Sequence, residues 1–106
     1  MLSLYLLADE APTPRPSDLS RLTPVGTLPE ESFRLLQAQR LLESRLEYAA
    51  GFRWSSSQAA AKLQLLARQF PELRPTTSSN ATPEQDLFLA LLAAQAQQMG
   101  LLATTG

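Results

Sequence analysis

From Leu87 to Gly106 the chain contains no charged residue. The first part of this segment, residues 87–94, reads Leu-Phe-Leu-Ala-Leu-Leu-Ala-Ala, so a helix formed there is apolar on every side. Such a helix must be surrounded, either by its own fold or by another molecule. Because a chain of 106 residues offers little protein to surround it, the segment favours burial against a partner. A central place in a monomeric bundle is the alternative.

The apolar residues of this chain favour helices over strands. Apolar residues make up 44% of the sequence, and most of them are Leu and Ala, with one Val (Val25) and no Ile. Strands favour β-branched side chains, whereas helices do not. The length is typical of one domain. The composition therefore predicts a single all-α domain, with a three-helix bundle as its architecture.

Three helix start signals recur along the chain, each a Ser or Thr followed three residues later by Glu or Gln. They begin at Thr27, Ser55 and Thr82, and the third also has Pro83 at its first helical position. Stop signals follow each one, at Gly51, Pro71 and Gly100. These signals predict helices over about residues 28–50, 56–70 and 83–99, with a short C-terminal tail.

The first 26 residues differ from the rest of the chain. Leu2, Leu4 and Leu6 alternate with other residues, which fits a short strand or an irregular helical turn equally well. A Pro-rich segment comes next, in which Pro12, Pro14 and Pro16 impose an extended path. We therefore expect an N-terminal arm over residues 1–26, beside a three-helix domain over residues 27–106. The arm either lies on the bundle or reaches a partner.

Side chains suited to catalysis or metal binding are scarce. The sequence has no Cys and no His, which removes thiolate nucleophiles, most zinc sites and the commonest general base. The carboxylate pairs at 30–31 and 84/86 fall in first helical turns, where they meet the positive end of the helix dipole. Glu43 and Glu47 are spaced for a metal but are flanked by Arg40 and Arg45. We predict a non-enzymatic protein without metal or cofactor.

The sequence carries no sign of membrane insertion or export. The apolar residues 1–7 have no Lys or Arg before them, and Asp9 and Glu10 follow at once, unlike a signal peptide. No stretch approaches the roughly 18 apolar residues of a membrane span. We therefore expect a cytoplasmic protein.

The first functional hypothesis is a small helical interaction module, such as an adaptor, an assembly chaperone, an inhibitor or a subunit of a larger complex. Only 18% of the residues are charged and the formal net charge is −1, so the surface is easy to bury. The partner is another protein or a second copy. The predicted partner-binding residues are Leu89, Phe88, Leu92, Met99 and Trp54, with Leu2, Leu4 and Leu6 of the arm.

The alternative is a regulatory protein that binds nucleic acid. Its binding residues would be the four cations between Gly51 and Pro75, namely Arg53, Lys62, Arg68 and Arg74. Aromatic residues stand among them. Against this hypothesis, the overall charge is negative and the cations are widely spaced, whereas nucleic-acid binders show denser clusters.

Overall fold

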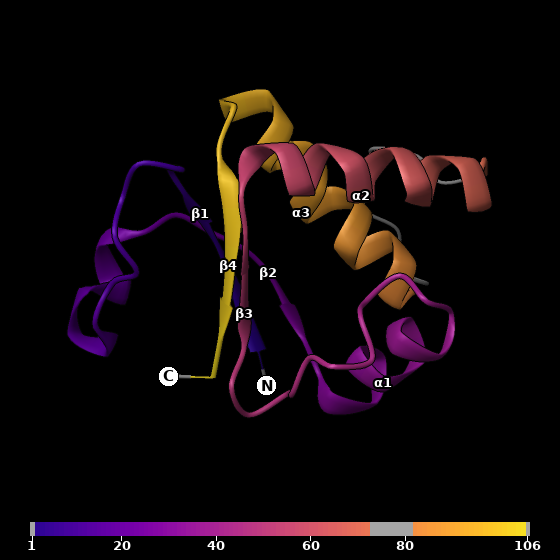
Figure 1. Ribbon diagram of the computed structural model, residues 1–106, viewed down its shortest axis with the longest axis horizontal. Coiled ribbons are helices and arrows are strands. Elements are labelled where there is room, and N and C mark those ends of the chain that lie inside the picture. The colour runs from indigo at the N-terminus through magenta and orange to yellow at the C-terminus, as the bar shows by residue number, and fades with distance from the viewer. Residues whose placement is uncertain (1, 73–81, 106) are drawn as a thin grey trace.

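A computed structural model describes residues 2–72 and 82–105 and shows a four-stranded antiparallel sheet with helices packed against it (Figure 1). The strands are β1 (Leu2–Leu7), β2 (Pro24–Leu28), β3 (Phe52–Trp54) and β4 (Gly100–Thr104), in the spatial order β2-β1-β4-β3. The prediction of an all-α three-helix bundle is therefore wrong. The fold is mixed α/β, and the expected C-terminal tail is the strand β4.

The three α-helices and the connection between the first two strands lie on opposite faces of the sheet. Helices α1 (Glu30–Ala38), α2 (Ser56–Gln69) and α3 (Pro83–Gln97) cover one face, here called the helix face. The connection between β1 and β2, which includes the short 3₁₀ helix η1 (Pro16–Arg21), lies on the other side, here called the second face (Figure 1).

The N-terminal residues form a central strand rather than an arm. Leu4 of β1 stands opposite Gly26 of β2 on one side and Ala103 of β4 on the other. The alternating side chains of β1 divide between the two faces, as a period of two requires. Leu2, Leu4 and Leu6 pack into the main core on the helix face, and Leu7 packs on the second face. Burial on both faces thus decides between a strand and a helical turn.

Aromatic and Leu side chains build the sheet where β-branched residues are lacking. The strand β3 contributes Phe52 and Trp54 to the core, and β4 contributes Leu101 and Ala103. Strand preference reflects how well a side chain packs on a half-buried pleated surface. The shortage of Val and Ile was therefore a poor guide, because burial against three helices determines these strands.

The first helix ends at Ala38, well before the predicted end near residue 50. Arg40 adopts a left-handed conformation with φ of 63°. The N–H of Leu41 donates to the carbonyl of Leu36 at 2.9 Å, and the N–H of Arg40 donates to the carbonyl of Gln37 at 3.0 Å. These two bonds form a Schellman motif, which usually has Gly at the left-handed position. Because Arg40 occupies that position, the sequence gives no glycine signal for the helix end.

The third helix ends in the same way. Gln98 has φ of 54°, and the N–H of Met99 donates to the carbonyl of Ala94 at 2.9 Å. Gly100 begins β4 instead of ending the helix. A side chain at Gly100 would collide with the carbonyl of Trp54, so this glycine permits close approach of β4 to the start of α2.

Gly51 also marks a strand rather than a helix end. Its φ is +71°, and a Cβ there would collide with the carbonyl oxygen of Ala103. Before it, the side chain of Gln37 donates to the carbonyls of Glu43 and Leu46 at 3.0 and 2.9 Å. These bonds hold the non-helical segment 39–51 against α1 and direct the chain into β3.

Two of the three predicted helix starts are confirmed. Ser55 and Gln58 form a complete capping box at α2, and the Thr82 hydroxyl accepts from the N–H of Gln85 at α3. The start predicted at Thr27 is wrong, because Thr27 lies within β2 and α1 begins after Pro29 without a side-chain cap. The helices α2 and α3 stop at residues 69 and 97, close to the predicted ends.

Candidate partner-binding site

Most of the predicted partner-binding residues are buried inside the protein. Each of these five is at most 8% exposed: Leu2, Leu4, Leu6, Trp54 and Phe88. Their own fold covers them, so they form the core rather than a docking surface. Leu89, Leu92 and Met99 are half-buried, and Leu92 and Met99 pack against the same core.

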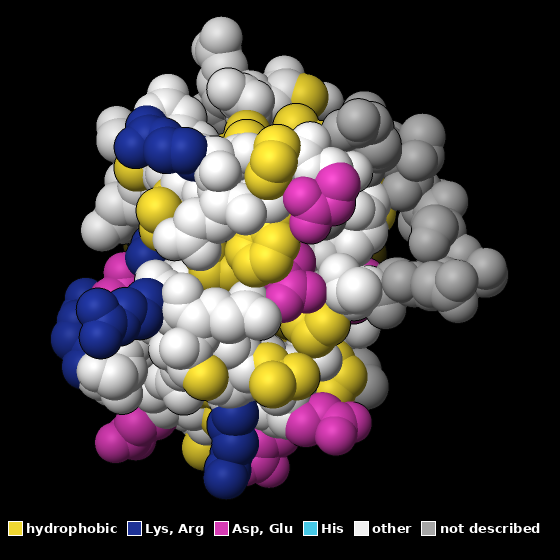
Figure 2. All heavy atoms as spheres, turned by 90° about the vertical axis from the view of Figure 1, so that its right-hand side faces the viewer, with side chains coloured by type: hydrophobic (Ala, Val, Ile, Leu, Met, Phe, Trp, Pro, Cys, Tyr) yellow, Lys and Arg dark blue, Asp and Glu magenta, His cyan; other side chains and the backbone are white. Residues whose placement is uncertain are grey.

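The fold itself surrounds the apolar third helix. Helix α3 contacts α1, α2 and the strands β1, β2 and β4. Among the described residues, Leu35 at 52% is the one large hydrophobic side chain that is well exposed. Figure 2 shows hydrophobic side chains in small separate groups on the face that it presents, interspersed with charged ones. The all-round apolar character of residues 87–94 is therefore explained without a partner.

An uncharged groove remains where α2 begins and α3 ends. These two helix ends lie at the top of Figure 1. The groove has a volume of about 440 Å³. None of its described lining residues is charged, and they are Ser56, Ser57, Ala60, Ala94, Gln95, Gln98 and Met99. We call these seven residues the α2–α3 groove. Small side chains on α2 leave the space, and the half-buried Met99 supplies an adaptable apolar contact.

A negative charge at the edge of the groove belongs to Asp9, which comes after β1 and binds the first turn of α2. The N–H of Ser56 donates to Asp9 Oδ1 at 2.7 Å, and the Ser56 hydroxyl donates to Oδ2 at 2.5 Å. These two hydrogen bonds, with a smaller contribution from the Arg53 charge, lower the pKa of Asp9 below its usual value. Asp9 is therefore an anion at neutral pH, and it holds the first turn of α2 at one end of the α2–α3 groove.

An ion pair joins segment 39–51 to α2. Lys62 Nζ lies 2.9 Å from Glu43 Oε1 and 5.6 Å from the centre of the Trp54 ring. Partial burial opposes ionisation of Glu43, but the hydrogen bond from Lys62, its own backbone N–H and the charges of Lys62 and Arg45 together lower its pKa. Glu43 Oε2 is buried without a hydrogen-bond partner. The pair orients Lys62 inward over Trp54.

The four cations of the nucleic-acid hypothesis do not share one surface. Arg53 extends over the second face, where its guanidinium donates to carbonyls of the β1–β2 connection. Lys62 is paired with Glu43 on the opposite side of the sheet, and Arg68 is exposed on α2. Arg74 lies outside the described residues. The three cations that can be placed therefore do not form a basic stripe.

The acidic side chains that the sequence places close together do not form a catalytic or metal-binding group among the described residues. Glu30 Oε2 binds Arg34 Nη2 at 2.6 Å, one turn later on the same helix. Burial raises the pKa of Asp86, in the first turn of α3. Glu43 and Glu47 do not share a helix face, because α1 has ended before them. Over residues 2–72 and 82–105, no group of three or more acidic side chains is placed to hold a metal ion.

No helix in the described part of the chain is long and apolar enough to cross a membrane. In comparisons with protein-family models, curated proteins and solved structures, none matched this chain. The candidate site is therefore defined by its own geometry and chemistry.

Most residues of the α2–α3 groove were missed by sequence reasoning, which found only Met99. Two features of the sequence are signals for the α2–α3 groove. The uncharged C-terminal segment contains Gln95 and Gln98, and the run Ala59-Ala60-Ala61 allows close approach of a neighbour. These two segments lie side by side only because α2 packs against α3, and no local sequence pattern predicts that packing.

Proposed function

We propose that this protein is a non-enzymatic interaction module that binds a partner protein through the α2–α3 groove. The observation that supports this most is the lining of the groove, in which no described residue carries a charge. The centres of protein interfaces are depleted in charged residues, because each charge must lose its hydration on binding.

The chemistry of the groove defines the kind of partner. Its walls are parts of two helices, with an apolar contact at Met99 and hydrogen-bonding groups at Ser57, Gln95 and Gln98. A helix of the partner that presents small apolar and uncharged polar side chains is complementary to these walls, and helices commonly dock into such grooves. An anionic helix face is not complementary, since the described lining offers it no cation and Asp9 at the edge of the groove is itself negative.

Other features of the chain support this proposal over a catalytic or nucleic-acid-binding function. The sequence has no Cys or His, and Lys62 is held in an ion pair with Glu43. Arg53 and Lys62 lie on opposite sides of the sheet, so no observation favours binding of nucleic acid. We also propose a cytoplasmic location, with which the lack of cysteine is consistent.

Site-specific photo-crosslinking in the producing cell tests the proposal. A photoreactive amino acid replaces Gln95, which lines the groove, or Gln97, an exposed glutamine on the same helical turn that does not line it. The proposal predicts a discrete adduct with one protein, or with a second copy, at residue 95 only. Equal adducts at both positions, or none at either, would contradict it.

A further inference from the structure

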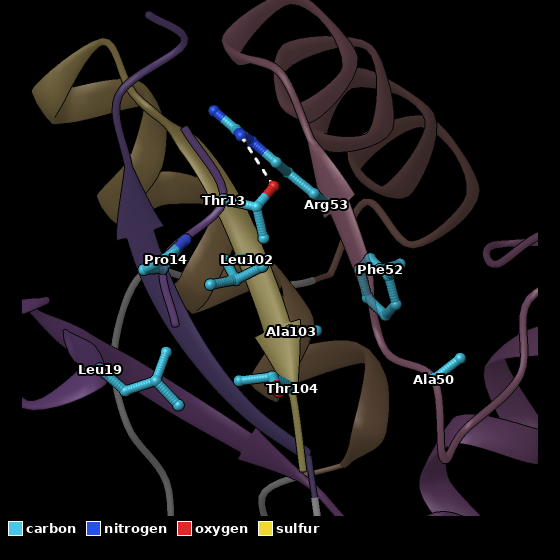
Figure 3. A pocket seen from close by; sticks show the side chains of 9 residues that line it. All are labelled: Thr13, Pro14, Leu19, Ala50, Phe52, Arg53, Leu102, Ala103 and Thr104. Atoms are coloured by element: carbon cyan, nitrogen blue, oxygen red, sulfur yellow. Dashed lines mark hydrogen bonds between the residues drawn. The ribbon is translucent and has the colours of Figure 1, made fainter. Parts of the chain in front are cut away.

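The second face of the sheet contains a separate pocket of about 270 Å³ (Figure 3). It lies between the β1–β2 connection and the strands β3 and β4. Its lining residues are Thr13, Pro14, Leu19, Ala50, Phe52, Arg53, Leu102, Ala103 and Thr104. We call it the second-face pocket. It shares no lining residue with the α2–α3 groove, so the proposal for this pocket does not rest on the proposed function.

Most of the pocket is lined by apolar residues, and several of them are buried by packing. Leu19 and Leu102 are 8% and 6% exposed and form a small core with Leu7. Ala103 and Phe52 are also buried. A volume of about 270 Å³ corresponds to roughly nine water molecules, enough for a small branched aliphatic group but not for a large ligand.

One end of the pocket holds the cation of Arg53, which the negative charge of Asp9 influences from beyond ion-pair distance. Figure 3 shows Arg53 beside Thr13 at this end, with Ala50 and Thr104 toward the other. Arg53 Nη2 donates to the carbonyls of Ala8, Asp9 and Ala11, and Nη1 donates to the Thr13 hydroxyl at 3.2 Å. All of these acceptors are neutral.

Part of the hydrogen-bonding capacity of Arg53 remains available. Arginine has five N–H groups in a planar fork, and Nε donates to no residue within the described part of the chain. The guanidinium also forms no ion pair with any described carboxylate, and the Asp9 carboxylate is occupied by Ser56. A half-buried arginine with unused N–H groups on Nε and Nη1 favours an anion, because a hydrogen bond from a charged donor to a carboxylate is stronger than one to a neutral acceptor.

We propose that the second-face pocket binds the carboxylate of a small aliphatic acid. The carboxylate meets Arg53 and the Thr13 hydroxyl, and the aliphatic body lies against Leu19 and Leu102. Two sources supply this chemistry, a free branched aliphatic acid and the C-terminal residue of a peptide ending in Leu or Val. Both present an apolar group within a few bonds of a carboxylate.

Amide chemical-shift titrations of the ¹⁵N-labelled full chain test this proposal. The probes are 4-methylpentanoate and its neutral isostere 4-methylpentanamide, with a leucine-terminated pentapeptide in free-acid and amidated forms. We expect saturable shifts of Leu102, Thr104 and the Arg53 side chain with an acid, and at least tenfold weaker binding of the matching amide. A pentapeptide acid that binds more tightly than 4-methylpentanoate identifies a peptide terminus as the source, and the reverse order identifies a free acid.

Two variants separate binding in the pocket from binding elsewhere. Ala50→Leu fills the mouth of the pocket, whereas Ala49→Leu places the same bulk one residue away at an exposed position that does not line it. We expect Ala50→Leu alone to weaken binding of the acid at least tenfold, without a change in melting temperature that would signal unfolding. Equal binding of acid and amide, equal effects of the two variants, or no shifts with any acid would overturn the proposal.

Discussion

Asp9 caps α2 from a position 47 residues away in the chain, through hydrogen bonds from both the N–H and the hydroxyl of Ser56. Ser55 and Gln58 already form a local capping box at this helix. The first turn of α2 thus receives acceptors from its own residues and from the segment after β1. An anion there also faces the positive end of the helix dipole. This contact joins the β1–β2 connection to the start of the α2–α3 groove.

The pKa of Asp9 sets a pH dependence of stability. Because the pKa is lower in the folded protein than in the unfolded chain, ionised Asp9 stabilises the fold above the unfolded value of about 4. That contribution is lost as the pH falls through the folded pKa. We therefore expect Asp9→Asn to destabilise the protein at pH 7 and to have much less effect at pH 2.5. Urea unfolding at the two pH values measures the difference.

Glu10→Gln removes an adjacent exposed carboxylate and serves as the control for Asp9→Asn. We expect it to change the free energy of unfolding at pH 7 by no more than about 0.5 kcal/mol, as for most surface substitutions. An Asp9→Asn variant with wild-type stability at pH 7 would show that the two Ser56 hydrogen bonds do not stabilise α2.

Leu4 distinguishes a core strand from a partner-binding arm. It is 0% exposed in the middle of β1, so Leu4→Ala leaves a cavity in the core and should cost about 2–5 kcal/mol of stability. Leu35→Ala, at the 52% exposed position on α1, should cost less than about 1 kcal/mol. Chemical denaturation measures both. If Leu4→Ala unfolded like the wild type, β1 would not be the central strand.

Gly51 is required by its backbone conformation and its neighbour. Gly51→Ala forces a side chain into a left-handed position against the Ala103 carbonyl, so we expect a loss of at least about 1–3 kcal/mol. Gly26→Ala is the matched control, because its Cβ would meet Leu4 Cδ1 at an ordinary 3.6 Å. Thermal unfolding should separate the two variants clearly. Similar melting temperatures would contradict the close packing of Gly51 on β4.

Gln98 offers the opposite effect. Its φ of 54° strains a residue with a side chain, so Gln98→Gly should stabilise the protein by up to about 1 kcal/mol. Gln97→Gly lies one residue earlier, at the last helical position of α3, and should destabilise by up to about 1 kcal/mol. Melting temperatures of the two variants test whether α3 ends where the Schellman bonds place it. A lower melting temperature for Gln98→Gly would count against that end.

Local sequence signals predicted what local physics determines. The caps at Ser55 and Thr82 involve residues three apart, so their spacing alone identifies them. The end of α1 escaped prediction because Arg40 takes a position that glycine usually fills. Residue type was an unreliable signal there, since tertiary packing of segment 39–51 outweighed it.

The sheet and the candidate site depend on contacts that are distant in sequence. The strand β3 has three residues, too few to show alternation, and β4 finds its partner β1 at the other end of the chain. Likewise, Ser57 and Gln95 line one groove only because α2 packs on α3. The uncharged segment from Leu87 onward correctly marked a buried helix, but its composition did not distinguish the protein's own core from a partner.

A pair of matched charge insertions tests the α2–α3 groove most directly. Gln95→Glu and Gln97→Glu add the same charge to exposed positions of the same helical turn, but only residue 95 lines the groove. Both variants should keep similar melting temperatures.

Calorimetric titration then measures the dissociation constant for the protein that crosslinks at residue 95, or for self-association if that protein is a second copy. Gln95→Glu should weaken binding at least tenfold and Gln97→Glu by less than about twofold, because only the former charge is desolvated in the complex. Equal dissociation constants for the two variants would show that the partner binds elsewhere.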